Sequence, residues 1–254
     1  MAKFSTITTR LFTGIPVVVG PSGVVISDII RRARDSSQRG CDVHLLEMNG
    51  VAVAHSSDAL RQTLLSACMV IPDGKWLELL TKKSAVPLSQ TRGEDLFRGV
   101  MAGDGGAPLR SFFLGSTPEV LGGLRETISR DYPGVMIVGE ECPPFRELSD
   151  QEVSNIAQTI RSSQAQIVWI GISTPRQDFL AAELARQTPA VVIAVGAAFE
   201  FVSGHKVSAP RWMSVIGVEW LFRLITEPRR LWRRYLIGGG IFLLQVFRFR
   251  SRDL

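Results

Sequence analysis

The feature that most constrains the fold is a recurring unit: a short apolar run, a glycine, a polar loop and a helical segment. In its clearest copy, Ile-Val-Trp-Ile-Gly at 167–171 precedes a polar loop and a helical segment at 179–186. Apolar runs without polar alternation are typical of parallel strands whose two faces are both covered. The repetition predicts βαβ units and therefore an α/β protein, doubly wound, with a mainly parallel sheet and Rossmann-like halves.

The remaining elements follow from the same patterns. Strands are expected at 15–20, 43–48, 69–71, 111–114, 135–138 and 190–195. Helices are expected at 23–34, 58–67, 96–101, 118–129 and 149–162, and after residue 204 at 212–225 and 228–236. Ser57 or Asp58 and Thr117 are the expected caps of two of these helices.

Composition limits the class of protein. The 254 residues are 45% hydrophobic and 21% charged, which suits a large core and excludes a disordered chain. We expect no signal peptide and no membrane-spanning helix. The longest apolar candidate, 235–247, contains three glycines and a glutamine and is about half a span, so it could lie on a membrane but not cross it.

Three cysteines without close spacing (Cys41, Cys68 and Cys142) argue against a disulfide framework and against a zinc site. A reducing, cytoplasmic setting is the expectation that follows.

Positive charge is concentrated at the carboxyl end. Residues 210–254 carry nine arginines against three acidic residues, whereas residues 1–209 are close to neutral. We therefore divide the chain into an α/β core, 1–209, and a basic helical appendage, 210–254. Anionic lipid, nucleic acid or a phosphorylated substrate could each be its partner.

Asp73 is a candidate general base. It follows a short apolar strand within Pro72-Asp73-Gly74, which is also ordinary turn chemistry. The functional alternative is a carboxylate at a strand's carboxyl end, facing the crevice where ligands bind in open α/β sheets.

Residues 175–178 (Pro175, Arg176, Gln177 and Asp178) are a candidate donor site. They place a cation, an amide and a carboxylate at a strand's carboxyl end, although such a group is more often a helix cap and a surface pair. Four strand-end glycines suggest close backbone approach to a phosphate: Gly115, Gly139, Gly171 and Gly196. The fingerprints of NAD-binding and ATP-binding loops are absent.

Glu200 could accept hydrogen bonds from a base or a sugar. The three histidines (His44, His55 and His205) have no metal-ligand spacing, and no Asp-x-Asp pair occurs. We therefore expect neither a bound metal nor a cofactor.

Seven short motifs in one order resemble the WecG/TagA/CpsF glycosyltransferases, over residues from about 10 to 235. They are Ile71-Pro72-Asp73-Gly74, Gly93-Glu94-Asp95-Leu96-Phe97, Phe113-Leu114-Gly115, the run from Gly171 to Asp178, Val195-Gly196-Ala197-Ala198-Phe199-Glu200, Ala209-Pro210-Arg211-Trp212-Met213, and the run from Gly217 to Arg230.

The resemblance implies an inverting, metal-independent transferase that moves a sugar from a UDP-sugar to an undecaprenyl-diphosphate-linked acceptor. It implies that Asp73 deprotonates the acceptor hydroxyl and that residues 175–178, where the family more usually has Pro-Lys-Gln-Glu, lie at the donor. Gly196 and Glu200 would border the nucleotide. The acceptor's diphosphate would lie near Glu47, Arg92 and the tail arginines Arg211, Arg223, Arg230 and Arg233.

Three positions depart from the family pattern. The usual Thr-x-Asn becomes Leu45 and Glu47, the usual Arg-Ala-Pro becomes Ser208-Ala209-Pro210, and an arginine usually found shortly before Gly93 is displaced, with Arg92 as its candidate replacement. The reaction class is expected to persist, whereas the identity of the sugar is left open.

The sequence therefore predicts a transferase of exopolysaccharide or cell-surface polysaccharide synthesis, bound peripherally to the inner face of the plasma membrane through its tail. A homo-oligomer is possible. The alternatives are a non-catalytic nucleotide-sugar or lipid-diphosphate binding protein, and a nucleic-acid binder, which the absence of a nucleic-acid motif disfavours.

Overall fold

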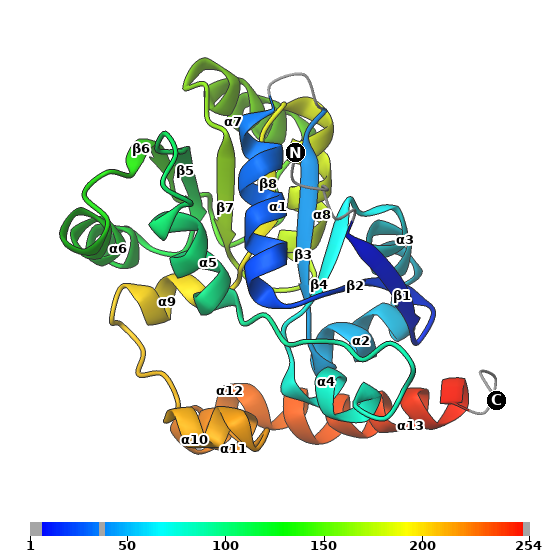
Figure 1. The fold of residues 1–254 in the computed structure, drawn as a ribbon. Coiled ribbons are helices and arrows are strands. Elements are labelled where there is room, and N and C mark those ends of the chain that lie inside the picture. Colours follow the sequence, from blue (N-terminus) through cyan, green and yellow to red (C-terminus); the bar gives the residue numbers. More distant parts are fainter. Residues whose placement is uncertain (1–6, 36–38, 251–254) are drawn as a thin grey trace.

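The computed structural model describes residues 7–35 and 39–250, and its centre is a six-stranded sheet (Figure 1). The strand order is β4-β3-β8-β7-β5-β6, and every neighbouring pair is parallel. The strands are β3 (Cys41–Leu46), β4 (Met69–Pro72), β5 (Arg110–Gly115), β6 (Met136–Glu141), β7 (Ile167–Gly171) and β8 (Val191–Ala194). The predicted α/β class with a parallel sheet is confirmed.

Helices cover both faces of this sheet. One face packs against α1 (Ser22–Arg34), α5 (Gly93–Ala102), α6 (Pro118–Asp131) and α9 (Ala198–Val202); the other packs against α7 (Asp150–Ser162) and α8 (Arg176–Gln187). Trp169 of β7 faces the first group, and its neighbours Val168 and Ile170 face the second. Both faces of the strand are buried, which explains why the sequence shows no polar alternation there.

The predicted first strand belongs to a separate hairpin. β2 (Ile15–Val19) pairs antiparallel with β1 (Thr8–Phe12) in a two-stranded sheet beside β4. The turn between them uses Thr13 and Gly14, both with positive φ. Two helices, α2 (Met48–Ser56) and α4 (Lys75–Thr81), were not predicted, whereas α3 (Asp58–Ser66) begins at Ser57 as expected, with the Ser57 hydroxyl accepting from the Leu60 amide.

Gly139 does not end its strand, so that prediction is wrong. β6 continues to Glu141, and a Cβ on Gly139 would lie 2.3 Å from the Phe112 ring. Glycine is needed at this position because an aromatic side chain of the neighbouring strand occupies the space.

Cys41 and Cys68 form a disulfide, contrary to the expectation that the cysteines would remain unpaired. Cys41 begins β3 and Cys68 immediately precedes β4. The parallel pairing of these strands brings the two Cα atoms to 5.3 Å, although 27 positions separate them in sequence. Spacing along the chain carries no sign of this proximity.

The carboxyl-terminal helices lie below the carboxyl ends of the strands (Figure 1). They are α10 (Arg211–Val215), α11 (Glu219–Thr226), α12 (Pro228–Trp232), a π-helical turn η1 (Arg233–Ile237) and α13 (Gly238–Arg250). The single helix predicted over 212–225 is interrupted by Gly217, whose φ is +79°.

α13 is held against the amino-terminal part of the chain. It packs on α2, and its Phe242 is fully buried with its ring stacked on Phe12 at 6.3 Å. None of the helices within residues 7–35 and 39–250 is both long and apolar enough to span a bilayer.

Candidate active site

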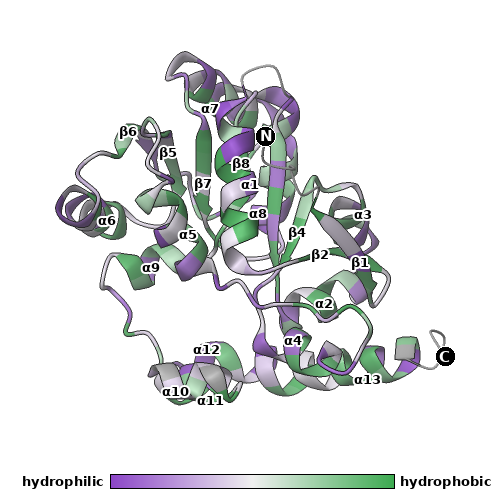
Figure 2. Ribbon diagram, viewed as in Figure 1, coloured by the Kyte–Doolittle hydropathy of each residue, from purple (hydrophilic) through white to green (hydrophobic). Residues whose placement is uncertain are grey.

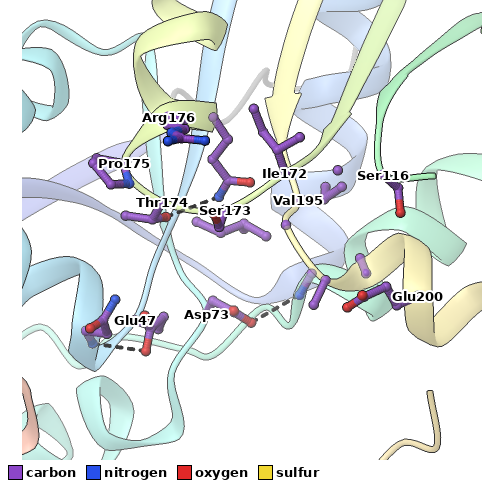
Figure 3. A pocket seen from close by; sticks show the side chains of 18 of the residues that line it. Glu47, Asp73, Ser116, Ile172, Ser173, Thr174, Pro175, Arg176, Val195 and Glu200 are labelled. Carbon is purple, nitrogen blue, oxygen red and sulfur yellow. Dashed lines mark hydrogen bonds between the residues drawn. The ribbon is translucent and has the colours of Figure 1, made fainter. Parts of the chain in front are cut away.

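A pocket of about 860 Å³ opens between the carboxyl ends of the parallel strands and the tail helices. One wall consists of the segments that follow β3, β4, β5, β7 and β8, and the other includes Trp220, Arg223, Arg234 and Tyr235 from the tail. Figure 3 shows Asp73, Glu47, Glu200, Ser116 and residues 172–176 facing this space. Neither the core nor the tail alone encloses it.

Asp73 lies on the floor of the pocket, directly after β4. Its backbone amide donates to the Leu46 carbonyl at 2.9 Å, and its Oδ1 accepts from the Gly93 amide at 3.1 Å (Figure 3). Burial raises the pKa of Asp73 to about 6; Glu219 and Glu47 add to the rise, whereas Arg223 and the Gly93 amide oppose it. A carboxylate with this pKa is ionised near neutral pH and is a better base than an ordinary aspartate.

Glu219 links the tail to the core beside Asp73. Its carboxylate accepts from Arg223 at 2.5 Å and from the Ser214 hydroxyl at 2.9 Å, and Arg92 lies 3.4 Å away. Although burial opposes it, the two arginines hold the pKa of Glu219 below its usual value. Arg223 also lies over the Phe201 ring at 4.8 Å, which holds its guanidinium where its charge lowers the pKa of Asp73.

The loop after β7 and the start of α8 contain two polar groups that could bind a ligand: the Arg176 guanidinium and the side-chain oxygen of Gln177. Arg176 is exposed in the pocket and pairs with no acidic side chain in the described part of the chain. Gln177 is buried, and its Nε2 donates to the Thr174 hydroxyl at 3.3 Å, whereas its Oε1 has no partner within residues 7–35 and 39–250. The amino end of α8 points here and favours an anion.

Glu47 is held on two sides. As the N-cap of α2 it accepts from the Asn49 and Gly50 amides, and it accepts from Arg234 of the tail at 2.9 Å. Arg234 was not predicted as a site residue; its buried Nε has no partner in the part of the chain that the structure describes. The Trp220 and Tyr235 rings, 6.0 Å apart, complete this wall. A run of basic residues in sequence does not show which arginine faces inward.

Glu200 and Arg230 line the pocket but are already paired. Lys206 lies 2.6 Å from Glu200 and 3.2 Å from Glu227, which in turn pairs with Arg230 at 2.5 Å. Ligand contacts by these side chains would compete with this chain of ion pairs.

Most predicted donor residues line the pocket: Gly171, Pro175, Arg176, Gln177, Gly196 and Glu200. So do four predicted acceptor residues: Glu47, Arg92, Arg223 and Arg230. Gly171 is needed for packing, since a Cβ there would lie 2.2 Å from the Phe199 ring.

Four predicted residues lie elsewhere. Gly115 and Gly139 do not line the pocket, and Arg233 is exposed over the Trp232 ring at 5.2 Å. Asp178 is buried beneath the loop and bound to His44, because the first turn of α8 directs consecutive side chains to different sides. The side chain of Arg211 lies outside the described part.

Across residues 7–35 and 39–250, no group of three or more His, Cys, Asp or Glu side chains could hold a metal ion.

The fold and the pocket together define an α/β protein with a large pocket at the carboxyl ends of parallel strands, where arginines suited to an anionic ligand lie near a buried carboxylate. The chain belongs to the glycosyl transferase WecG/TagA/CpsF family, whose model matches residues 11–253. It is 30% identical over 175 residues to the N-acetylglucosaminyldiphosphoundecaprenol N-acetyl-beta-D-mannosaminyltransferase of Bacillus spizizenii, and 28% identical over 175 residues to the enzyme of the same name from Bacillus subtilis. Each match covers 68% of this chain and 66% of the relative.

Proposed function

We propose that this protein is an inverting, metal-independent glycosyltransferase that moves a sugar from a UDP-sugar to a polyprenyl-diphosphate-linked acceptor during envelope polysaccharide synthesis. The observation that carries the proposal is Asp73, a carboxylate with a pKa of about 6 on the floor of a pocket lined by arginines. Family membership and the names of the two relatives support the class of reaction and a lipid-diphosphate acceptor.

In the proposed reaction Asp73 accepts the proton of the acceptor hydroxyl. The acceptor oxygen then forms a bond to the anomeric carbon of the donor sugar while the bond from that carbon to UDP breaks. UDP departs with the bonding electron pair on the opposite side of the carbon, so the configuration inverts. A positioned base of this kind contributes about 10²–10⁴-fold to the rate.

The departing diphosphate is assigned to the start of α8. Arg176 is the cation of this wall that has no acidic partner among the described residues, and the helix N-terminus adds a favourable dipole. The Gln177 amide lies beside the Gly196 backbone at the same end of the sheet, where it can meet the donor.

The acceptor's diphosphate is assigned to the tail side, between Arg223 and Arg234. Both guanidinium groups are held by carboxylates, Glu219 and Glu47, so they are oriented before the ligand arrives. Arginine forks match phosphate oxygens in two-point hydrogen bonding.

Membrane contact is assigned to the outer surface of the tail. Exposed apolar side chains occur along the tail together with exposed arginines, and Figure 2 shows mixed apolar and polar stretches along α10 to α13. The most exposed apolar side chains include Trp212, Ile225, Leu236, Leu244 and Phe247. A surface of this composition suits an anionic bilayer, and binding there would bring the protein to a lipid-linked acceptor. The proposed location is the inner face of the plasma membrane. The lipid-diphosphate acceptor in the names of the relatives supports this location. Unpaired cysteines no longer support it, because Cys41 and Cys68 form a disulfide.

The test is transfer from a panel of UDP-sugars to a synthetic polyprenyl-diphosphate-linked N-acetylglucosamine, with and without a chelator. Wild-type protein should release UDP in proportion to lengthened acceptor, and Asp73→Asn should bind UDP without transfer. UDP binding with no turnover on any acceptor by the wild type would favour the binding-protein alternative instead.

A further inference from the structure

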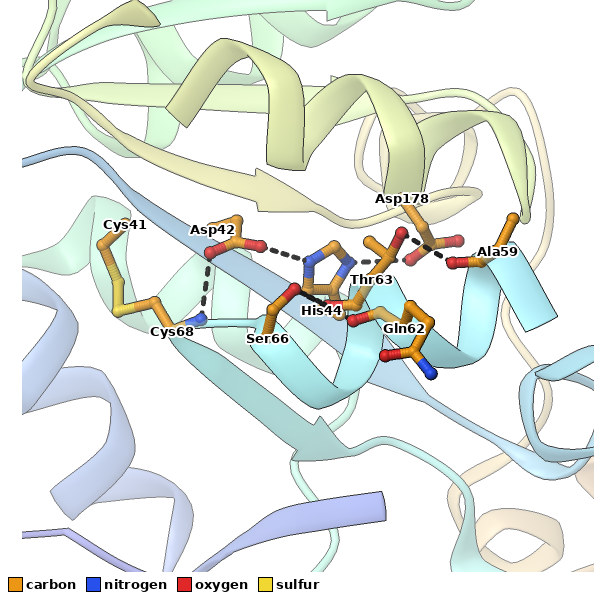
Figure 4. A network of polar contacts seen from close by, with 9 residues as sticks. All are labelled: Cys41, Asp42, His44, Ala59, Gln62, Thr63, Ser66, Cys68 and Asp178. Carbon is orange, nitrogen blue, oxygen red and sulfur yellow. Dashed lines mark hydrogen bonds and ion pairs between the residues drawn. A yellow bond between two sulfur atoms is a disulfide. The ribbon is translucent and has the colours of Figure 1, made fainter. Parts of the chain in front are cut away.

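A buried polar network joins β3 to the first turn of α8, directly behind the residues of that turn that line the pocket. His44 of β3 is fully buried, with Nε2 2.9 Å from Asp42 and Nδ1 2.9 Å from Asp178 (Figure 4). Asp42 comes from the same strand, and Asp178 from the first turn of α8. Three ionisable side chains therefore join the sheet to the helix whose first residues line the pocket.

The protonation of His44 follows from its partners. Both ring nitrogens face carboxylates, and a neutral imidazole could donate to only one of them. Burial alone would lower the pKa of His44, but the hydrogen bonds to Asp178 and Asp42 outweigh it and raise the pKa to about 9. The ring is accordingly an imidazolium at neutral pH and donates to both carboxylates.

The two carboxylates differ in their other contacts. The second oxygen of Asp42 accepts from the Cys68 amide at 2.9 Å, which holds Asp42 in place from the start of β4. The second oxygen of Asp178 is buried and has no hydrogen-bond partner among the described residues. His44 is thus the side chain that anchors Asp178, and replacing His44 would leave the buried Asp178 carboxylate without its partner.

Asp178 follows directly after the two residues that face the donor pocket. Its amide donates to the Pro175 carbonyl at 3.0 Å, and Gln177 and Arg176 precede it in the same turn. Any shift of Asp178 relative to β3 would carry these residues with it.

We infer that His44 is a positioning residue for the donor site: it holds the first turn of α8 against β3 through Asp178, and so fixes Arg176 and Gln177 in the pocket. Its role in donor affinity rests on the proposed function, whereas its hold on the loop does not. The histidine touches no substrate.

The experiment compares wild type, His44→Asn and Asp28→Asn as folded full-length proteins. Asp28 is a suitable control because it is a largely buried side chain, 9% exposed, that binds Arg31 and Arg32 but lies on α1, on the opposite face of the sheet. Hydrogen–deuterium exchange of peptides covering 173–180 reports the loop without any ligand, and calorimetry with UDP reports the donor site.

For His44→Asn we expect at least about 10-fold faster exchange in this segment and about 10-fold weaker UDP binding, while Asp28→Asn keeps wild-type values for both. Asp178→Glu should retain more UDP affinity than Asp178→Asn, because it keeps the carboxylate that His44 binds. Unchanged exchange over 173–180 in His44→Asn would overturn the inference. Wild-type protein that binds no UDP but shows the faster exchange in His44→Asn would count against the proposed function and leave the anchoring role supported.

Discussion

Replacing Asp73 by asparagine should make the protein less active and more stable at once. Asparagine keeps an oxygen for the Gly93 amide and nearly the same volume, so the change removes mainly the charge. On the proposed function, transfer should fall about 10²–10⁴-fold because the acceptor hydroxyl would lose its base.

The gain in stability follows from the raised pKa. Burial moves the pKa of Asp73 from 3.8 to about 6, so the folded state binds this proton more tightly than the unfolded chain does. A group shifted upward favours folding below the unfolded pKa, and that contribution is lost as the pH rises through the folded pKa. This rise in the pKa of Asp73 corresponds to up to about 3 kcal/mol of lost folding stability above pH 6. That loss is equivalent to roughly 5–10 °C in Tm for a chain of this size.

The assay is thermal unfolding of wild type and Asp73→Asn from pH 4 to pH 8. The two melting temperatures should coincide near pH 4 and separate through pH 6, with the asparagine variant the higher. A constant difference across this range, or a less stable variant at pH 7.5, would refute the claim that an ionised Asp73 is held there against its burial. A parallel pH–rate profile of wild type should show transfer falling below about pH 6, with a midpoint set by the same group.

Three further outcomes are expected. Arg234→Gln should raise the KM for the lipid-linked acceptor about 10-fold in steady-state assays while leaving UDP affinity unchanged, because its guanidinium lies on the tail wall against Glu47. Leu244→Glu combined with Phe247→Glu should reduce sedimentation with anionic vesicles several-fold without changing the circular dichroism spectrum, since both side chains are 69% exposed. Gly171→Ala should destabilise the protein by about 1–3 kcal/mol in urea unfolding, because its Cβ would lie 2.2 Å from a ring atom of Phe199.

The sequence predicts the central sheet well because its signals are local. Each parallel strand is an apolar run closed by a loop, and Asp73 and residues 175–178 follow such runs directly, so their approach to a common edge can be expected. Asp178 shows the limit of this reasoning: its position at the edge was correct, but the direction of its side chain depends on the turn of α8 and on a histidine 134 residues away.

Contacts between distant segments account for the other differences. The Cys41–Cys68 bond depends on the register of β3 and β4, and the inward orientation of Arg234 depends on a π-helical turn between α12 and α13. Neither the disulfide nor the orientation of Arg234 is indicated by a periodic pattern in the sequence. Gly139 and Gly171 had the correct residue type for a close approach, but the partner of each is an aromatic ring of the core and not a phosphate.

Asp73, Glu47 and Glu219 line the same pocket, so the pKa of Asp73 should change when a charged ligand binds there. Both neighbouring carboxylates already raise the pKa of Asp73, and a bound diphosphate would add negative charge to the same space. On the proposed function, UDP binding near pH 6 would therefore be accompanied by proton uptake, visible as a dependence of the calorimetric heat on the ionisation enthalpy of the buffer. The bound donor would make ionised Asp73 a stronger base but would also lower the fraction of Asp73 that is ionised near pH 6, so transfer would need a higher pH than the titration of the free protein suggests.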